Sequence, residues 1–227
     1  MNGLLRIACS GGWVIRGITM GVSALALSAC SALSPTATPA TAFYALDGAQ
    51  KSVVVSAERR AVALSKHTLL ISPPHAAAGF DSTRIIYLRE PHRLDYYALS
   101  QWVDPPARML GPLLVAAIEK TGAFQAVVLM PGAASGEVRL ETVIIRLQHE
   151  FQTHPSQVRL TLRATLLDDR TRKVLAWQAF DAVEPASSED AYGGVLAANR
   201  AVQTVMDEVA LFVAAKAGAA KTVPAIP

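Results

Sequence analysis

The chain has 227 residues, of which 52% are apolar and 17% are charged, and this balance suits one globular domain with short appendages. The formal net charge is +3, and loss of a leader that contains Arg6 and Arg16 would reduce the 21 Lys and Arg to 19 against 18 Asp and Glu. A near-neutral surface without clustered Lys and Arg argues against a nucleic-acid partner, because neutralising phosphates needs such clusters.

The N-terminus has the pattern of a secretory signal. A start that carries Arg6 and Arg16 precedes an uncharged, largely apolar run at residues 17–29. This run is too short to span a bilayer, which takes about 20 residues. Its length and flanks are typical of a signal peptide, which we predict at residues 1–29.

The stretch Leu27-Ser28-Ala29-Cys30 resembles the bacterial lipobox, a branched apolar residue and two small residues before a cysteine. It predicts that Cys30 carries diacylglycerol and an N-acyl chain. We expect no other cofactor and no metal. Loss of Cys9 with the signal would leave Cys30 as the only cysteine, so no intrachain disulfide is expected. The alternative is an ordinary signal peptide followed by an incidental cysteine.

The residues after Cys30 predict a lipoprotein that stands off its membrane. Ser31 replaces the Asp that favours inner-membrane retention, so we expect the outer membrane facing the periplasm, with the inner membrane as the alternative. The Ser, Thr, Ala and Pro at residues 31–42 read as a flexible tether. Extended at about 3.1 Å per residue, these residues would reach about 37 Å. Lipidated N-terminus and tether thus occupy residues 30–42.

The domain itself is expected at residues 43–216, with a disordered tail at 217–227. Seven later segments have the alternating or continuous apolar pattern of strands, and residues 124–131 read as a buried one. The turn at residues 168–171 predicts an antiparallel hairpin between the last two. The segments lie at residues 67–74, 82–90, 92–103, 124–131, 137–151, 156–169 and 173–183.

Two helices complete the expected fold. The first has Asp104 at the N-cap, Pro105 at the first helical position and Gly122 after its end, and Pro112 should kink it. Ser188, Glu189 and Asp190 could cap the second helix, whose apolar stripe covers the sheet or forms a seam with a partner helix. We therefore predict a single α+β domain, a mixed and mostly antiparallel sheet packed with two main helices. The stripe of the second helix comprises Val195, Ala198, Val202, Val205, Val209 and Phe212.

No stretch predicts a catalytic or metal site. The sequence holds no Gly-x-Ser-x-Gly elbow, Walker motif or dinucleotide-binding glycine motif. His149 and His154 stand five residues apart, and on a helix they would lie about 140° apart instead of sharing a face. We expect solvent-facing histidines there and not a zinc site.

The candidate contact residues lie in two places. Asp81 and Arg84 form either a charged recognition loop or a turn with a local ion pair or cap. In the strand at residues 95–102, Tyr96 and Trp102 should share one side and Tyr97 the other. Aromatic side chains at such a corner pack it or contact a partner, and a buried Trp102 would belong to the core.

Residues 79–124, which follow a lipobox, a tether and the stretch Phe-Tyr-Ala-Leu-Asp-Gly, strongly resemble the ABC-type transport auxiliary lipoproteins, the paraquat-inducible protein C-like family. The family pattern is a strand that ends in Tyr-Tyr, a Trp soon after, and a Pro that opens a Leu-rich helix. The positions that match are Tyr96, Tyr97, Trp102, Pro105 and Leu110.

The resemblance implies a non-catalytic lipoprotein that works beside an ABC permease, its ATPase and an MCE-domain (mammalian cell entry) protein. It also implies transport of lipids or other apolar compounds, and assembly of the lipoprotein into a homo-oligomeric ring. One alternative is a periplasmic carrier that holds an acyl chain in an internal apolar cavity. Another is an envelope hydrolase.

Overall fold

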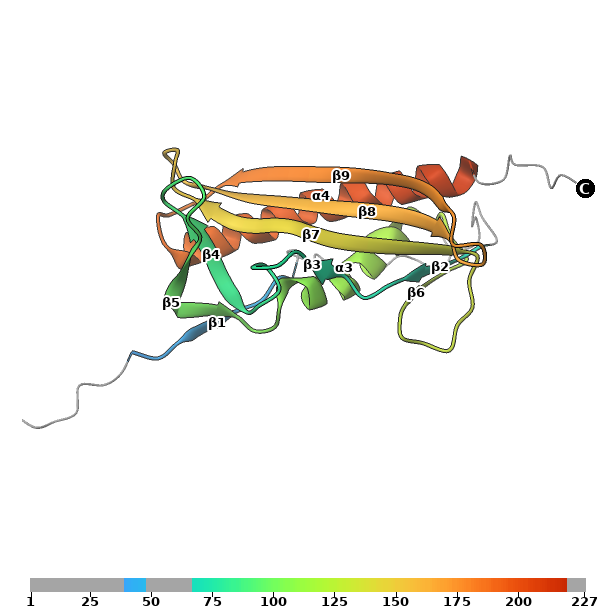
Figure 1. Cartoon of the computed structure of the whole chain (residues 1–227), viewed down its shortest axis with the longest axis horizontal. Coiled ribbons are helices and arrows are strands. Elements are labelled where there is room, and N and C mark those ends of the chain that lie inside the picture. The colour runs from blue at the N-terminus through green and yellow to red at the C-terminus, as the bar shows by residue number, and fades with distance from the viewer. Residues whose placement is uncertain (1–38, 48–66, 220–227) are drawn as a thin grey trace, which may run out of the picture. The chain divides into compact units, whose positions relative to one another are not determined.

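A computed structural model of the chain describes residues 39–47 and 67–219. The signal peptide, Cys30 and most of the tether lie outside these residues. The described part contains nine strands and two helices (Figure 1), which confirms the α+β class. In chain order they are β1 (Ala42–Tyr44), β2 (Thr68–Ile71), β3 (His75–Ala76), β4 (Arg84–Leu88), β5 (Asp95–Trp102), α3 (Pro106–Thr121), β6 (Ala126–Leu129), β7 (Val138–Glu150), β8 (Gln157–Asp168), β9 (Val174–Pro185) and α4 (Ala191–Ala219).

All nine strands belong to one mixed sheet centred on β7. Along one edge of β7 lie β2, β3 and β4, each pairing parallel with a different part of the strand. Along its other edge runs β8, which continues into β9 as the expected antiparallel hairpin. β4 pairs antiparallel with β5, and β1 and β6 add parallel strands to β5 and β2. The two long pairings, β7–β8 and β8–β9, are both antiparallel.

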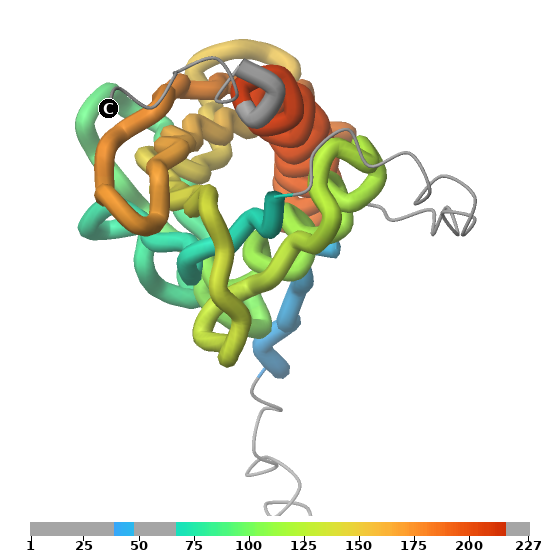
Figure 2. Tube along the Cα trace, turned by 90° about the vertical axis from the view of Figure 1, so that its right-hand side faces the viewer, coloured from blue at the N-terminus to red at the C-terminus, as the bar shows by residue number. Residues whose placement is uncertain are grey.

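The two helices pack on the sheet and on each other. α4 lies on β8 and β9 and follows the long strands (Figure 1), whereas α3 packs on β2, β3 and β6. Viewed end-on, the two helices lie side by side (Figure 2), in agreement with their mutual contacts. Between helices and strands lie fully buried leucines and isoleucines such as Leu110, Leu114, Ile118, Leu140 and Leu160.

The apolar stripe of α4 is part of this core, so the expectation that it covers the sheet is confirmed. Its six predicted members are all at most 8% exposed. Asp190 caps the helix, as its Oδ1 accepts hydrogen bonds from the Gly193 N–H at 2.8 Å and from the Ser188 hydroxyl at 2.7 Å.

The start of α3 differs from the prediction. Pro105 occupies the N-cap and Pro106 the first turn, and no side chain caps the helix. Asp104 instead accepts a hydrogen bond from Arg108 at 3.4 Å, four residues on. Two consecutive prolines move the start by one residue, because a residue before proline is driven out of helical geometry. The predicted end is confirmed, since Gly122 has φ 64° and its N–H donates to the Glu119 carbonyl.

β6 is less buried than expected. Ala126 is exposed and the three residues after it are half-buried. The strand pairs only with β2 among the described residues, at an edge of the sheet. A continuous apolar run therefore does not distinguish a central strand from an edge strand that a helix covers on one face.

Candidate functional site

A polar chain, fully buried at two of its three members, links β5, β7 and the loop after β7. The Tyr97 hydroxyl lies 3.0 Å from His149 Nδ1, and His149 Nε2 lies 2.8 Å from Ser156 Oγ. His149 is 2% exposed and Ser156 is fully buried. The prediction that His149 faces solvent is therefore wrong, whereas the side chain of His154 is 89% exposed.

The reversal at His149 has a cause in the backbone of β7. The β7–β8 pairing shifts register between Ile144 and Arg146, and one extra residue turns the following side chains to the other face. Residues 138, 140, 142 and 144 are buried before the shift, and Leu147 and His149 are buried facing the helices after it. Two consecutive isoleucines, Ile144 and Ile145, are the only sequence signal of this change.

Electrostatics fix the direction of the hydrogen bonds. Burial lowers the pKa of His149, against the opposing effect of Glu189 and Asp190, and burial raises the pKa of Tyr97. Tyr97 is therefore protonated and donates to Nδ1 of a neutral imidazole, whose Nε2–H donates to Ser156. The Ser156 backbone N–H donates to Glu189 Oε1 at 2.9 Å, and hydrogen bonds from Ser156 lower the pKa of that carboxyl.

Helix α4 closes this chain from one side. A Cβ at Gly194 would lie 2.5 Å from His149 Nδ1, so only glycine lets the first turn of the helix approach the ring so closely. Sequence reasoning missed both Gly194 and Ser156. The Gly193-Gly194 pair after the capping residues was the available signal, because glycine lowers helix propensity and needs a packing reason inside a helix.

Aromatic rings close the chain from the other side. Phe151 lies 4.3 Å from the ring of His149 between centroids, and Tyr87 lies 4.8 Å from the ring of Tyr97. The guanidinium of Arg89 lies 4.9 Å from the centroid of Phe151 and 5.5 Å from that of Tyr87. Ser156 and His149 have the atoms of a nucleophile and a base, but a nucleophile must reach its substrate. The arrangement instead fastens β5, β7 and α4 together.

The predicted contact residues lie in different environments. Trp102 is 3% exposed and belongs to the core, and Tyr97 is part of the buried chain. Tyr96 is 51% exposed, and the guanidinium of Arg84 lies 4.3 Å from the centre of its ring. Asp81 is exposed, and within the described residues it forms no ion pair with Arg84.

Tyr96 and Trp102 do not share a face, contrary to the expected alternation. Tyr96 pairs with Ile86, whereas Gln101 pairs with Arg84. Between these two pairs, four residues of β5 (97–100) thus oppose one residue of β4, and the three extra residues, an odd number, reverse the facing. Because of this irregularity Trp102 enters the core and Tyr96 lies at the surface.

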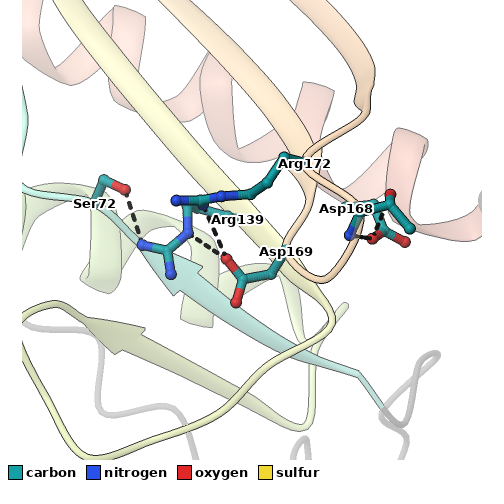
Figure 3. Close-up of polar contacts among 6 residues, drawn as sticks. Ser72, Arg139, Asp168, Asp169 and Arg172 are labelled. Carbon is teal, nitrogen blue, oxygen red and sulfur yellow. Dashed lines mark hydrogen bonds and ion pairs between the residues drawn. The ribbon is translucent and has the colours of Figure 1, made fainter.

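A second polar cluster lies at the other end of the long strands and joins the start of β7 and the end of β8 to the residue after β2 (Figure 3). Arg139 donates to Asp169 Oδ1 at 2.5 Å and to the Ser72 hydroxyl at 3.2 Å, and Arg172 lies 3.3 Å from the same Asp169 oxygen. The hydrogen bond from Arg139 holds the pKa of Asp169 below its usual value. Each of these groups pairs with another, so the cluster fixes the turn between β8 and β9.

The described residues contain no group of three or more His, Cys, Asp and Glu that could hold a metal ion. Neither α3 nor α4, the helices in the described ranges, is long and apolar enough to cross a membrane.

Comparison with known proteins identifies a family. Residues 44–210 match the family described as the ABC-type transport auxiliary lipoprotein component. A crystal structure of a DUF330 protein from Xanthomonas campestris is similar, with a TM-score of 0.65 and 24% identity over 70% of this chain and 90% of that chain. A crystal structure of an uncharacterised protein gives a TM-score of 0.58 at 10% identity, over 77% and 99%. These two likenesses concern the fold. No curated protein matches the sequence.

Proposed function

The chain belongs to the ABC-type transport auxiliary lipoprotein component family, and from this membership we propose that it is a docking subunit of an MCE-type system for lipids or other apolar compounds. Its family makes it an auxiliary lipoprotein of ABC-type transport in the bacterial envelope. The observation that carries the proposal is the extent of the match, residues 44–210, which runs from the end of β1 into α4.

The proposed subunit acts by contact and not by catalysis. The described serine–histidine pair, Ser156 and His149, is sealed between α4 and an aromatic cluster, and both residues are at most 2% exposed. Its hydrogen bonds are all used to join elements of the fold. This burial supports a structural role, because a catalytic pair would have to meet a substrate.

The proposed anchor is Cys30, acylated after removal of residues 1–29. Two or more acyl chains suffice for stable membrane attachment, at about 0.8 kcal/mol for each buried CH₂. We place the protein on the outer membrane, facing the periplasm. The tether at residues 30–42 would then present the domain, residues 43–216, to the rest of the transport system, with a tail at 217–227.

The proposed surface for protein contacts is the edge strand β9. Within the described residues β9 pairs only with β8, which leaves the backbone groups of its other edge available for pairing. Trp177 on this strand is 65% exposed, and Val174 and Leu175 are 50% and 40% exposed. A free edge with a projecting Trp suits both proposed contacts, that with the MCE-domain protein and that with further copies of the chain.

In-cell crosslinking of the tagged, full-length protein, followed by mass spectrometry of what is captured, tests the proposal. We expect an MCE-domain protein among the captured proteins, together with higher-order bands of the lipoprotein itself. A Trp177→Asp variant should lose these products while its membrane attachment and circular dichroism spectrum stay unchanged. Capture of no transport protein by a correctly anchored chain would contradict the proposal.

The same preparation separates the carrier and hydrolase alternatives. A carrier purified from cells would contain one non-covalent lipid for each chain, whereas a docking subunit would not. A hydrolase would act on chromogenic esters or peptides, and we expect no turnover on either panel.

A further inference from the structure

One side of the sheet near the start of the domain is apolar and uncovered. β1 pairs parallel with β5, and Phe43 lies opposite Gln101. Paired residues project from the same face, so the side chain of Phe43 lies beside that of Gln101. Leu99 and Val103 flank Gln101 two residues before and after it, and the Val103 N–H donates to the Tyr44 carbonyl of β1 at 2.8 Å. Phe43, Leu99 and Val103 are 63%, 46% and 56% exposed. We call these three residues the β1–β5 face.

A cation and an aromatic ring border the β1–β5 face. Arg84 lies opposite Gln101 in the antiparallel partner strand, which directs its side chain to the same face. Its guanidinium stacks over the ring of Tyr96, which is 51% exposed. The nearest acidic residues along β5 and after it are already occupied: Asp95 pairs with Arg93 at 3.2 Å, and Asp104 with Arg108 at 3.4 Å. The charge of Arg84 is thus not neutralised by an ion pair within the described residues.

The chain enters the domain at this face. β1 begins at Ala42, so Phe43 lies thirteen residues after Cys30 in the sequence. An extended chain of that length spans about 40 Å at 3.1 Å per residue. A membrane that holds Cys30 is therefore always within reach of the β1–β5 face, at the millimolar effective concentration of a short linker.

We propose that the β1–β5 face rests on the lipid surface that holds the anchor. The inference depends on the proposed lipidation of Cys30 and adds a second, non-covalent membrane contact. Phe43, Leu99 and Val103 enter the boundary between headgroups and acyl chains, where apolar and aromatic side chains gain from leaving water. Arg84 binds the phosphates of anionic lipids, which its planar guanidinium can contact with two N–H groups. Two attachment points, the anchor and the face, would hold the domain in one orientation on the membrane.

Site-specific fluorescence on the full-length, lipidated protein tests this contact. The acylated mature chain offers no free thiol, so a cysteine introduced by Leu99→Cys can be labelled uniquely with an environment-sensitive dye. The matched control is Leu211→Cys on α4, where the native side chain is 68% exposed. Both proteins are reconstituted into vesicles of phosphatidylethanolamine and phosphatidylglycerol that contain a lipid-borne quencher.

We expect quenching of the dye at position 99 and none at position 211, because interfacial apolar faces lie about 5–10 Å into the headgroup and acyl boundary. Phe43→Glu, introduced beside the labelled position 99, should abolish that quenching while the protein still floats with the vesicles. Arg84→Gln should weaken it in vesicles with phosphatidylglycerol and leave it unchanged in neutral ones.

Three results would overturn the inference in distinguishable ways. A floating, lipidated protein without quenching at position 99 would show that the face does not touch the membrane, and would leave the proposed function intact. Mass spectrometry that finds an unmodified Cys30 in the mature chain would overturn the anchor itself. Equal quenching at positions 99 and 211 would also contradict an oriented contact.

Discussion

Tyr96 and Tyr97 are neighbours in one strand and have opposite environments. The Tyr97 hydroxyl donates a hydrogen bond to the buried imidazole of His149 and helps join β5, β7 and α4. Tyr96 stacks under Arg84 at the surface and is half exposed. The two sides of β5 therefore have different roles. One side packs against the rest of the fold, and the other side is exposed and free to contact a partner or a membrane. The identity of a tyrosine therefore does not predict its role until it is known which face of the sheet its side chain occupies.

The largest contrast between buried and exposed positions is expected at the tryptophans. Trp102→Ala should lower the free energy of unfolding by about 3–5 kcal/mol, because it removes a large side chain from the core. Trp177→Ala, at a residue that is 65% exposed, should change it by less than about 0.5 kcal/mol. Urea unfolding of the two purified variants measures both. Equal losses would show that the distinction between the two sites is wrong.

The next largest difference in stability is expected between alanine substitutions at two glycines, Gly194 and Gly132. Gly194→Ala places a methyl group 2.5 Å from His149 Nδ1, and the overpacking should destabilise the protein by up to about 3 kcal/mol. Gly132→Ala is the matched control, since its Cβ would meet no atom closer than 3.6 Å. Thermal unfolding distinguishes the two, and an unchanged midpoint for Gly194→Ala would mean that α4 does not approach the ring as described.

The tyrosines test the buried chain directly. Tyr97→Phe leaves His149 Nδ1 without its donor and should cost about 1–3 kcal/mol of unfolding free energy, the penalty for a buried unsatisfied group. Tyr96→Phe removes a hydroxyl from an exposed ring and should stay within about 0.5 kcal/mol of the parent. Denaturant midpoints compared at neutral pH decide the matter. A costly Tyr96→Phe would contradict the assignment of the two faces.

The smallest effect is a dependence of stability on pH. Burial lowers the pKa of His149 below its value of about 6.5 in the unfolded chain. The unfolded state then binds more protons than the folded state near this pH. The contribution of neutral His149 to the free energy of unfolding is therefore complete above pH 6.5. It decreases as the pH is lowered below 6.5, by at most about 1.4 kcal/mol per pH unit.

His149→Gln should remove this slope between pH 6.5 and pH 5, and His154→Gln, at an exposed residue, should keep it. Glu189 and Asp190 act in a lower window, because hydrogen bonds from Ser156 and Gly193 lower their pKa values. Unfolding measured at several pH values from 5 to 7.5 therefore isolates His149. A slope that survives in His149→Gln would assign the effect to another group.

Periodicity and capping residues were enough to predict most of the fold. Alternation along β8 and the stripe of α4 follow from a constant spacing of buried apolar residues, and Gly122 ended α3 where its left-handed conformation requires it. Prediction failed where the spacing changes. The shifts in β7 and between β4 and β5 each reverse a face, which buried His149 and separated Tyr96 from Trp102.

The candidate contact residues could be predicted only in part. Arg84 and Tyr96 lie at the surface, but the pairing that joins them to Phe43 depends on which strands are neighbours, and β1 and β5 are far apart in the sequence. The edge position of β9 likewise depends on the order of strands in the sheet. Local patterns carry no information about such long-range pairings.

The most direct test of the account places a photoreactive phenylalanine analogue at position 43 or at position 177 in cells that contain the whole transport system. We expect position 177 to capture a transport protein or a second copy of the chain, and position 43 to capture lipid. Capture of protein at position 43 and of nothing at position 177 would contradict it, because the contact surface would then lie on the face that we assign to the membrane.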